Sequence, residues 1–230
     1  MSLEQSLKEL ANEDSPLRHS SLLGLTGLSE AQVATFQQVW RLVSAARRRR
    51  AIARLVELAE ENAEMDFNSV FIACLDDPDD EVRERALSGL WEYDDRSLIS
   101  KLIKLLTSDS SERVRAAAAL GLGRFAALAQ EDKVLSGDAE RVRDCLLAVF
   151  EDARGGLELQ RRSLEAVAPF NTPRIKEHIR RGYGHSDPSM RCSAIHAMGR
   201  TGEVGWLPLI LKEEQAGYSS DNCAYVKADI

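Results

Sequence analysis

Apolar residues along this chain recur at helical spacing, in pairs of stripes separated by short polar turns. In the clearest pair, the first stripe is Leu98, Ile99, Leu102, Ile103, Leu105 and Leu106, and the second is Val114, Ala118, Leu122 and Phe125. Spacings of three and four residues place side chains on one face of a helix. Segments in which apolar and polar residues alternate, as in strands, are not found. The sequence therefore predicts helix pairs and essentially no strand.

The same frame returns along the chain about every 32 residues. Val82-Arg83 with Ala86 and Leu90 is matched by Val114-Arg115 and by Met190-Arg191, and weaker copies contain Gln160 and Arg18. One helix pair cannot bury its apolar stripes alone, whereas stacked pairs can. We therefore expect an all-α superhelix, a solenoid of about six helix pairs plus a terminal fragment, forming one domain over residues 1–230. The predicted repeats are 2–27, 29–62, 66–93, 97–128, 139–170 and 173–201, with a partial repeat at 204–230.

The turns carry their own signals. Asp77-Pro78, Thr172-Pro173 and Asp187-Pro188 each predict an N-cap followed by proline at the first helical position. The spacing between Arg115 and Gln160 is longer than the other steps. We expect the extra residues to form a polar surface loop around 129–139, although insertions in solenoids also line binding faces. Near the end of the chain, residues 220–227 predict the start of another turn and helix.

This pattern resembles the HEAT repeat family, in particular the bacterial HEAT-like repeats named after phycobilisome bilin lyases. The residues that carry the resemblance are Asp77-Pro78-Asp79, Val82-Arg83, Ala86 and Leu90, and in the next repeat Ser108-Asp109, Val114-Arg115, Ala118 and Leu120-Gly121. The resemblance implies a right-handed superhelix. It also implies that Arg18, Arg83, Arg115 and Arg191 bridge to turn aspartates of neighbouring repeats. Because these motif residues are structural, the resemblance is specific for fold rather than function.

Composition adds several expected absences. The formal net charge of −7 argues against a general coat for nucleic acid. Cys74, Cys145, Cys192 and Cys223 lie far apart and are interpreted as reduced thiols. The His-Glu dipeptides that hold iron in deoxyhypusine hydroxylase, a HEAT enzyme, are missing, so we expect no catalytic residue, metal or cofactor. No apolar run is long enough to span a membrane, and a cytoplasmic protein is expected.

The second helix of each repeat presents mixed polar residues to solvent, with no ligand type repeated from one repeat to the next. Glu84, Ser88, Glu92, Arg124 and Glu165 lie on these positions and are predicted to face one groove. Trp91 stands where other repeats have Gly123, Ala168 or Gly199. Core filling is the favoured interpretation of Trp91, and an exposed binding anchor is the alternative. The leading hypothesis is a non-catalytic scaffold or adaptor that binds another protein through the concave face.

A run of four arginines, Arg47, Arg48, Arg49 and Arg50, begins the second helix of the second repeat. Cations at a helix start oppose the helix dipole and repel one another. Acidic side chains or a binding partner must therefore neutralise their charge. The favoured interpretation is a solvated helix end. The alternatives are an acidic protein partner and a phosphate backbone, and the latter makes a nucleic-acid-binding protein the alternative function. A bilin-lyase-like subunit is a further alternative, implied only by the name of the repeat type.

Overall fold

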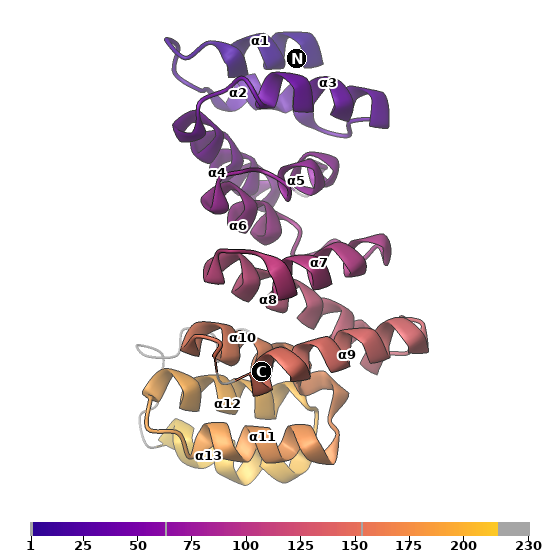
Figure 1. The fold of residues 1–230 in the computed structure, drawn as a ribbon, viewed down its shortest axis with the longest axis vertical. Coiled ribbons are helices and arrows are strands. Elements are labelled where there is room, and N and C mark those ends of the chain that lie inside the picture. The colour runs from indigo at the N-terminus through magenta and orange to yellow at the C-terminus, as the bar shows by residue number, and fades with distance from the viewer. Residues whose placement is uncertain (1, 63, 153, 216–230) are drawn as a thin grey trace. The chain divides into compact units, whose positions relative to one another are not determined.

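The computed structural model describes residues 2–62, 64–152 and 154–215, and over these residues it contains helices and no strand (Figure 1). The predicted all-α fold is confirmed. The chain divides into two compact units, residues 1–93 and 94–230, and the boundary falls between the third and fourth predicted repeats. Because repeats contact mainly their neighbours, such a division is compatible with one repeat array. The single domain over residues 1–230 stays a prediction.

The first unit holds three helix pairs. Its elements are α1 (Leu3–Ala11), α2 (His19–Leu22), the 3-10 turn η1 (Leu23–Leu25), α3 (Glu30–Trp40), α4 (Ala45–Glu61), α5 (Asn68–Cys74) and α6 (Asp80–Gly89). The first helices α1, α3 and α5 pack in sequence, and the second helices α2, α4 and α6 form a parallel layer. Phe36, Ile52 and Phe71 are fully buried between the two layers.

The second unit continues the same scheme. Its elements are α7 (Ser97–Ser108), α8 (Glu112–Gln130), α9 (Ser136–Glu151), α10 (Leu157–Val167), η2 (Ala168–Phe170), α11 (Pro173–Tyr183), α12 (Pro188–Arg200), η3 (Val204–Trp206) and α13 (Leu207–Gln215). The second helices α8, α10 and α12 pack side by side. A Cβ atom added to Gly123 of α8 would lie 3.1 Å from Cα and Cβ of Ala166 in α10. Small residues therefore allow close packing of α8 and α10.

The longer fourth repeat contains less loop than expected. Helix α8 continues to Gln130 and α9 begins at Ser136, so only residues 131–135 connect them, and the expected loop at 129–139 is wrong at both ends. The alanines at the end of α8 favour helix. Asp132, with a φ of 58°, then stops it in the left-handed region. The backbone N–H of Lys133 donates to the carbonyl of Leu128, which closes a Schellman turn.

Two of the three predicted N-caps are confirmed. The Thr172 hydroxyl accepts from the backbone N–H of Ile175, and Asp187 accepts from those of Ser189 and Met190. At the remaining turn, Asp77-Pro78, the N-cap is Asp79 rather than Asp77, and α6 begins at Asp80. Asp77 is instead buried, and its Oδ1 accepts from the backbone N–H of Asp79 at 2.9 Å. The proline therefore lies in the turn, two residues before the helix.

The described residues test the remaining expectations in part. Cys74 and Cys145 are free, in agreement with the reduced thiols expected at these positions. Cys223 and the turn and helix expected at 220–227 lie outside the described residues. None of the described helices is long and apolar enough to cross a membrane.

Candidate interaction surface

Helix α6 ends at Gly89, whose backbone lies against an aromatic ring. A Cβ atom added to Gly89 would lie 2.6 Å from ring atoms of Phe71 in α5, so only glycine fits this contact. Leu90 then buries its side chain, and the backbone N–H groups of Leu90 and Trp91 donate to the carbonyls of Leu87 and Ser88. This tight turn follows a helix of only 10 residues, compared with 19 in α8.

Trp91 lies in that turn with 60% of its surface exposed. The favoured interpretation of Trp91 as a core-filling residue is therefore wrong. The residue aligned with it, Gly123, lies inside α8, whereas α6 has already ended before Trp91 and Leu90 has closed the core. Trp40 and Trp206 are only 5% and 8% exposed, which confirms that both belong to the core. Of the three tryptophans, one stands in solvent.

Three other predicted site residues lie on α6 or in the turn after it, near Trp91 in the sequence. Glu84 and Ser88 are four residues apart on α6, and the Ser88 hydroxyl donates to the Glu84 carbonyl at 3.2 Å. Trp91 and Glu92 are exposed in the turn that follows the end of α6 at Gly89. The buried residues Val82, Ala86 and Leu87 lie on the opposite side of the helix. We name the set Glu84, Ser88, Trp91 and Glu92 the α6 stripe.

The predicted site residues of the second unit have different environments. Arg124 is partly exposed, with Nη2 3.9 Å from the Asp94 carboxylate. Glu165 is buried, and its carboxylate lies 3.0 Å from Nη1 of Arg162. Burial alone would lower the pKa of Arg162, but the nearby carboxylates of Glu165 and Glu158 raise it. Glu165 thus neutralises a neighbour on its own helix, and Arg124 is the more accessible of the two.

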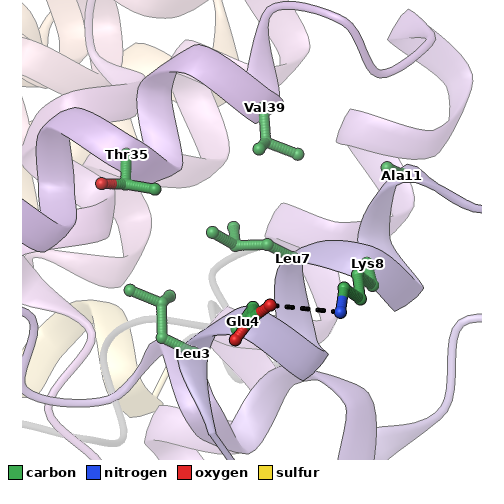
Figure 2. Close-up of a pocket in the computed structure, with 7 residues that line it drawn as sticks. All are labelled: Leu3, Glu4, Leu7, Lys8, Ala11, Thr35 and Val39. Atoms are coloured by element: carbon green, nitrogen blue, oxygen red, sulfur yellow. Dashed lines mark ion pairs between the residues drawn. The ribbon is translucent and has the colours of Figure 1, made fainter.

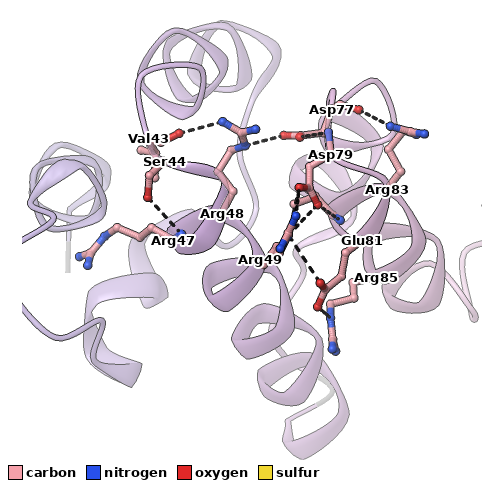
Figure 3. A network of polar contacts seen from close by, with 11 residues as sticks. Val43, Ser44, Arg47, Arg48, Arg49, Asp77, Asp79, Glu81, Arg83 and Arg85 are labelled. Carbon is pink, nitrogen blue, oxygen red and sulfur yellow. Dashed lines mark hydrogen bonds and ion pairs between the residues drawn. The ribbon is translucent and has the colours of Figure 1, made fainter.

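The four arginines of α4 do not form one solvated patch. Arg47 is 1% exposed, and its guanidinium donates to three backbone carbonyls of the preceding helix pair (Figure 3 shows the side chain). Nε bonds to the carbonyl of Leu10 at 2.7 Å, Nη1 to that of Ser15 at 2.8 Å and Nη2 to that of Glu9 at 2.7 Å. Two of these carbonyls lie in the last turn of α1 and the third lies just beyond it, so Arg47 caps that helix.

Arg48 and Arg49 reach the next helix pair instead. Nε of Arg48 lies 3.0 Å from Oδ2 of Asp77, a buried ion pair, and Oδ2 also accepts from the Trp40 indole at 2.6 Å. Arg49 forms hydrogen bonds of 2.6–3.0 Å with Asp79 (Figure 3). The hydrogen bond from Arg49 is the main reason that the pKa of Asp79 is lowered. Arg50 is exposed. The interpretation as a solvated helix end therefore holds for Arg50 and not for Arg47 or Arg48.

The arginines expected to bridge repeats also bind within their own repeat. Nη1 of Arg83 donates to the carbonyl of Asp77, Nε of Arg115 to that of Leu106, and Nη1 of Arg191 to those of His185 and Ser186. Each acceptor lies at the end of the first helix or in the turn that follows it. In the first unit, Arg48 and Arg49 of the neighbouring second helix reach the turn aspartates Asp77 and Asp79.

Two hollows lie elsewhere on the surface. An apolar groove of about 360 Å³ is lined by Leu3, Leu7 and Ala11 of α1 and by Val39 of α3, with the Glu4–Lys8 ion pair at its rim (Figure 2). A second hollow, of about 160 Å³, lies against the 131–135 turn and is lined by residues of both charges, including Arg96, Asp132 and Lys133. Among the described residues, no group of three or more His, Cys, Asp or Glu side chains is placed to hold a metal ion.

Residues 68–156 match the family model of HEAT repeats. Over these residues the chain is similar to HEAT repeats. Among solved structures, the chain is similar to the complex of CpcE and CpcF of phycocyanin lyase from Nostoc sp. PCC7120, with 20% identity and a TM-score of 0.51 over 74% of this chain and 99% of that one. It is also similar to a designed armadillo repeat protein in complex with the peptide (KR)4, with 18% identity and a TM-score of 0.51 over 87% of this chain and 100% of that one.

At these identities, the similarity establishes the helical-repeat fold alone. No curated protein is similar enough to this chain to count as a match. The expected HEAT resemblance is thus confirmed, whereas the predicted site residues stay predictions.

Proposed function

We propose that this chain is a non-catalytic adaptor that binds another protein through the surface of its second helices, which the sequence predicts to be concave. The observation that carries the proposal is the exposure of Trp91 on the α6 stripe. A tryptophan that remains 60% exposed forgoes most of the free energy that its burial would contribute. Tryptophan is also among the residue types most often found as energetic anchors in protein interfaces.

The similar structures support this proposal because both are complexes with a bound partner. CpcE is bound to CpcF, and the designed armadillo protein is bound to a peptide. Stacked repeats build extended surfaces without requiring special residues, so one exposed anchor and its polar neighbours suffice to select a partner. Non-enzymatic function and a cytoplasmic location belong to the same proposal. The likeness to a lyase complex concerns the fold, and no described residue favours a bilin-lyase-like subunit over an adaptor.

Nucleic-acid binding through the arginines of α4 has less support. Arg47 and Arg48 are buried, and Arg49 is hydrogen-bonded to Asp79. A phosphate backbone is gripped by several accessible cations along one surface. Arg50 alone does not supply such a surface.

Affinity capture from extract of the source cells, with and without nuclease, tests the proposal. We expect wild-type protein to retain a stoichiometric protein partner after nuclease treatment, and Trp91→Ala to lose it. Leu42→Ala is the matched control, because Leu42 is 85% exposed and lies in the turn between α3 and α4. Equal capture by wild type and Trp91→Ala, or a partner that nuclease removes, would refute the proposed interface.

A further inference from the structure

Two apolar surfaces are exposed on the first and last described helices. One is the groove between α1 and α3, and the other is formed by Leu207 and Leu211, which we name the α13 ridge (Figure 2 shows the groove). We propose that the α13 ridge of one copy packs into the α1–α3 groove of a second copy, so that the chain associates head to tail. This inference goes beyond the proposed adaptor function, because it uses neither the α6 stripe nor the second helices.

The α1–α3 groove lies between two rows of side chains. Its walls are Leu3, Leu7 and Ala11 of α1, and Thr35 and Val39 of α3 (Figure 2). Neighbours within each row are four residues apart, and such residues lie on one face of a helix. The groove therefore has two parallel rows as walls and accepts a third row between them.

The α13 ridge is part of a cluster of exposed apolar residues. Eight large apolar side chains of the described residues are exposed, and three of them, Val204, Leu207 and Leu211, lie within eight residues. Single exposed apolar side chains are ordinary, whereas a cluster marks an interaction surface. Helix α13 itself packs on α12, and Glu213 accepts from the hydroxyl of Tyr183. The ridge is thus held on an anchored helix.

The ridge and the groove match in spacing. Residues four apart on a helix are separated by about 6 Å along its axis. This distance separates Leu207 from Leu211, and it also separates successive residues of each wall of the groove. Rows of side chains with four-residue spacing interdigitate when helices pack, which is the commonest class of helix packing in globular proteins. A helix with two leucines four residues apart is therefore a suitable occupant.

The charges beside the two surfaces are complementary. Glu4 and Lys8 lie at the rim of the groove, and their side chains remain mostly exposed although they pair at 3.2 Å. Lys212 and Glu214 are exposed on α13 beside the ridge. Each surface thus offers one acid and one base to the other, and neither surface repels it. Exposed pairs contribute little affinity but fix orientation, so the leucines supply the affinity.

Different surfaces in contact make the association heterologous. A dimer of this kind leaves one groove and one ridge unoccupied, so further copies add until a ring closes. The contact involves few side chains, and small interfaces are weak. We therefore expect association that increases with protein concentration rather than a permanent dimer.

Sedimentation velocity of the full chain at about 5–500 μM tests the proposal, a range suited to weak interfaces. The weight-average sedimentation coefficient of wild type should rise with concentration. Leu211→Glu and Thr35→Glu, which each bring a carboxylate into the contact, should each raise the apparent Kd by about 10-fold or more. The matched control is Leu120→Glu, because Leu120 of α8 is 45% exposed and Leu211 is 44% exposed. This control should associate as wild type does.

Mixing the two variants decides the geometry. Leu211→Glu keeps its groove and Thr35→Glu keeps its ridge, so an equimolar mixture should form a dimer with one copy of each and nothing larger. Circular dichroism melts verify that each variant is folded, and Leu207→Gln tests the same ridge if Leu211→Glu is not.

Three results would overturn head-to-tail association. Undiminished association of Thr35→Glu would mean that ridge meets ridge, and undiminished association of Leu211→Glu would mean that groove meets groove. A wild type that stays monomeric over the whole range would remove the second copy as occupant. In that case, a lower melting temperature of Leu211→Glu than of Leu120→Glu would show that the ridge is covered within its own chain.

Discussion

Helices α4 and α8 contact their neighbouring helix pairs by different means. In the first unit, arginines of α4 reach outward in both directions, with Arg47 to backbone carbonyls at the end of α1 and Arg48 and Arg49 to aspartates before α6. In the second unit, α8 and α10 meet through Gly123 and Ala166. The first arrangement requires polar groups to be matched one by one, whereas the second requires only the absence of bulk.

This difference explains why the first unit is harder to recognise from its sequence. Small-residue packing preserves the repeat frame, because alanine and glycine recur at fixed positions. Guanidinium groups that reach across to a neighbouring pair need only the correct length and direction, so the second repeat has lost the frame. A run of like charges in a degenerate repeat can therefore be an internal connection rather than a binding patch.

The largest expected effect is at Arg47. Arg47→Met keeps much of the apolar volume but leaves the carbonyls of Glu9, Leu10 and Ser15 without this donor. We expect the free energy of unfolding to fall by about 3–5 kcal/mol, because buried polar groups without partners are costly. Urea denaturation followed by circular dichroism measures it. Arg50→Met, at an exposed position, should change stability by less than about 0.5 kcal/mol, and equal losses at both positions would contradict the structural role of Arg47.

The second-largest expected loss of stability is at Asp77, because its carboxylate accepts from two buried donors. Asp77→Leu removes the acceptor of the Trp40 indole and leaves the Arg48 guanidinium without its carboxylate. We expect a loss of about 2–4 kcal/mol in the same denaturation assay. Adding Arg48→Met to Asp77→Leu should restore part of that loss, since an unpaired buried charge is worse than an apolar pair. Additive losses in the double variant would show that the ion pair does not couple these residues.

In the second unit, substitutions of glycine test the close packing of the helices. Gly123→Val introduces bulk within 3.1 Å of Ala166 and should lower stability by about 1–3 kcal/mol. A Cβ atom added to Gly199, aligned with it in α12, would meet no neighbouring side chain of the described residues within 4 Å. Gly199→Ala should instead raise stability by about 0.5–1 kcal/mol through helix propensity. Thermal melts of both variants decide it. If Gly123→Val is tolerated as well as Gly199→Ala, close packing does not join α8 to α10.

The same glycines also show which structural features can be predicted from the sequence and which cannot. The period of the apolar stripes was sufficient to predict the helical-repeat fold. The sequence did not reveal that Gly123 touches Ala166 while Gly199 does not meet such a neighbour, since both read as the same frame position. For Trp91 the missing information was that α6 ends at Gly89, before Trp91. Glu165 was predicted to face solvent, but it is buried and paired with Arg162, three residues away on the same helix.

The smallest expected effect is a dependence of stability on pH, which tests the contact between Arg49 and Asp79 in the first unit. The pKa of Asp79 is lowered in the folded chain, chiefly by the hydrogen bond from Arg49. Because the unfolded chain binds this proton more readily, the contribution of the ionised carboxylate is present above the unfolded pKa of about 3.9 and is lost as pH falls through the lower folded value. Asp79→Asn keeps an N-cap acceptor but cannot ionise. Its denaturation midpoint should therefore lie below that of wild type at pH 7 and converge with it below about pH 3.

The same titration with Arg49→Met separates the ion pair from the cap. Without the guanidinium, the principal cause of the lowered pKa of Asp79 is gone, while the hydrogen bond from the backbone N–H of Val82 remains. The pH-dependent effect of Asp79→Asn should then be smaller in the Arg49→Met background than in the wild-type background. An undiminished effect would assign the lowered pKa of Asp79 to the helix start alone. In that case Arg49 would contribute nothing to joining α4 and α6, and the contrast between the units would rest on the buried Arg47 and Arg48.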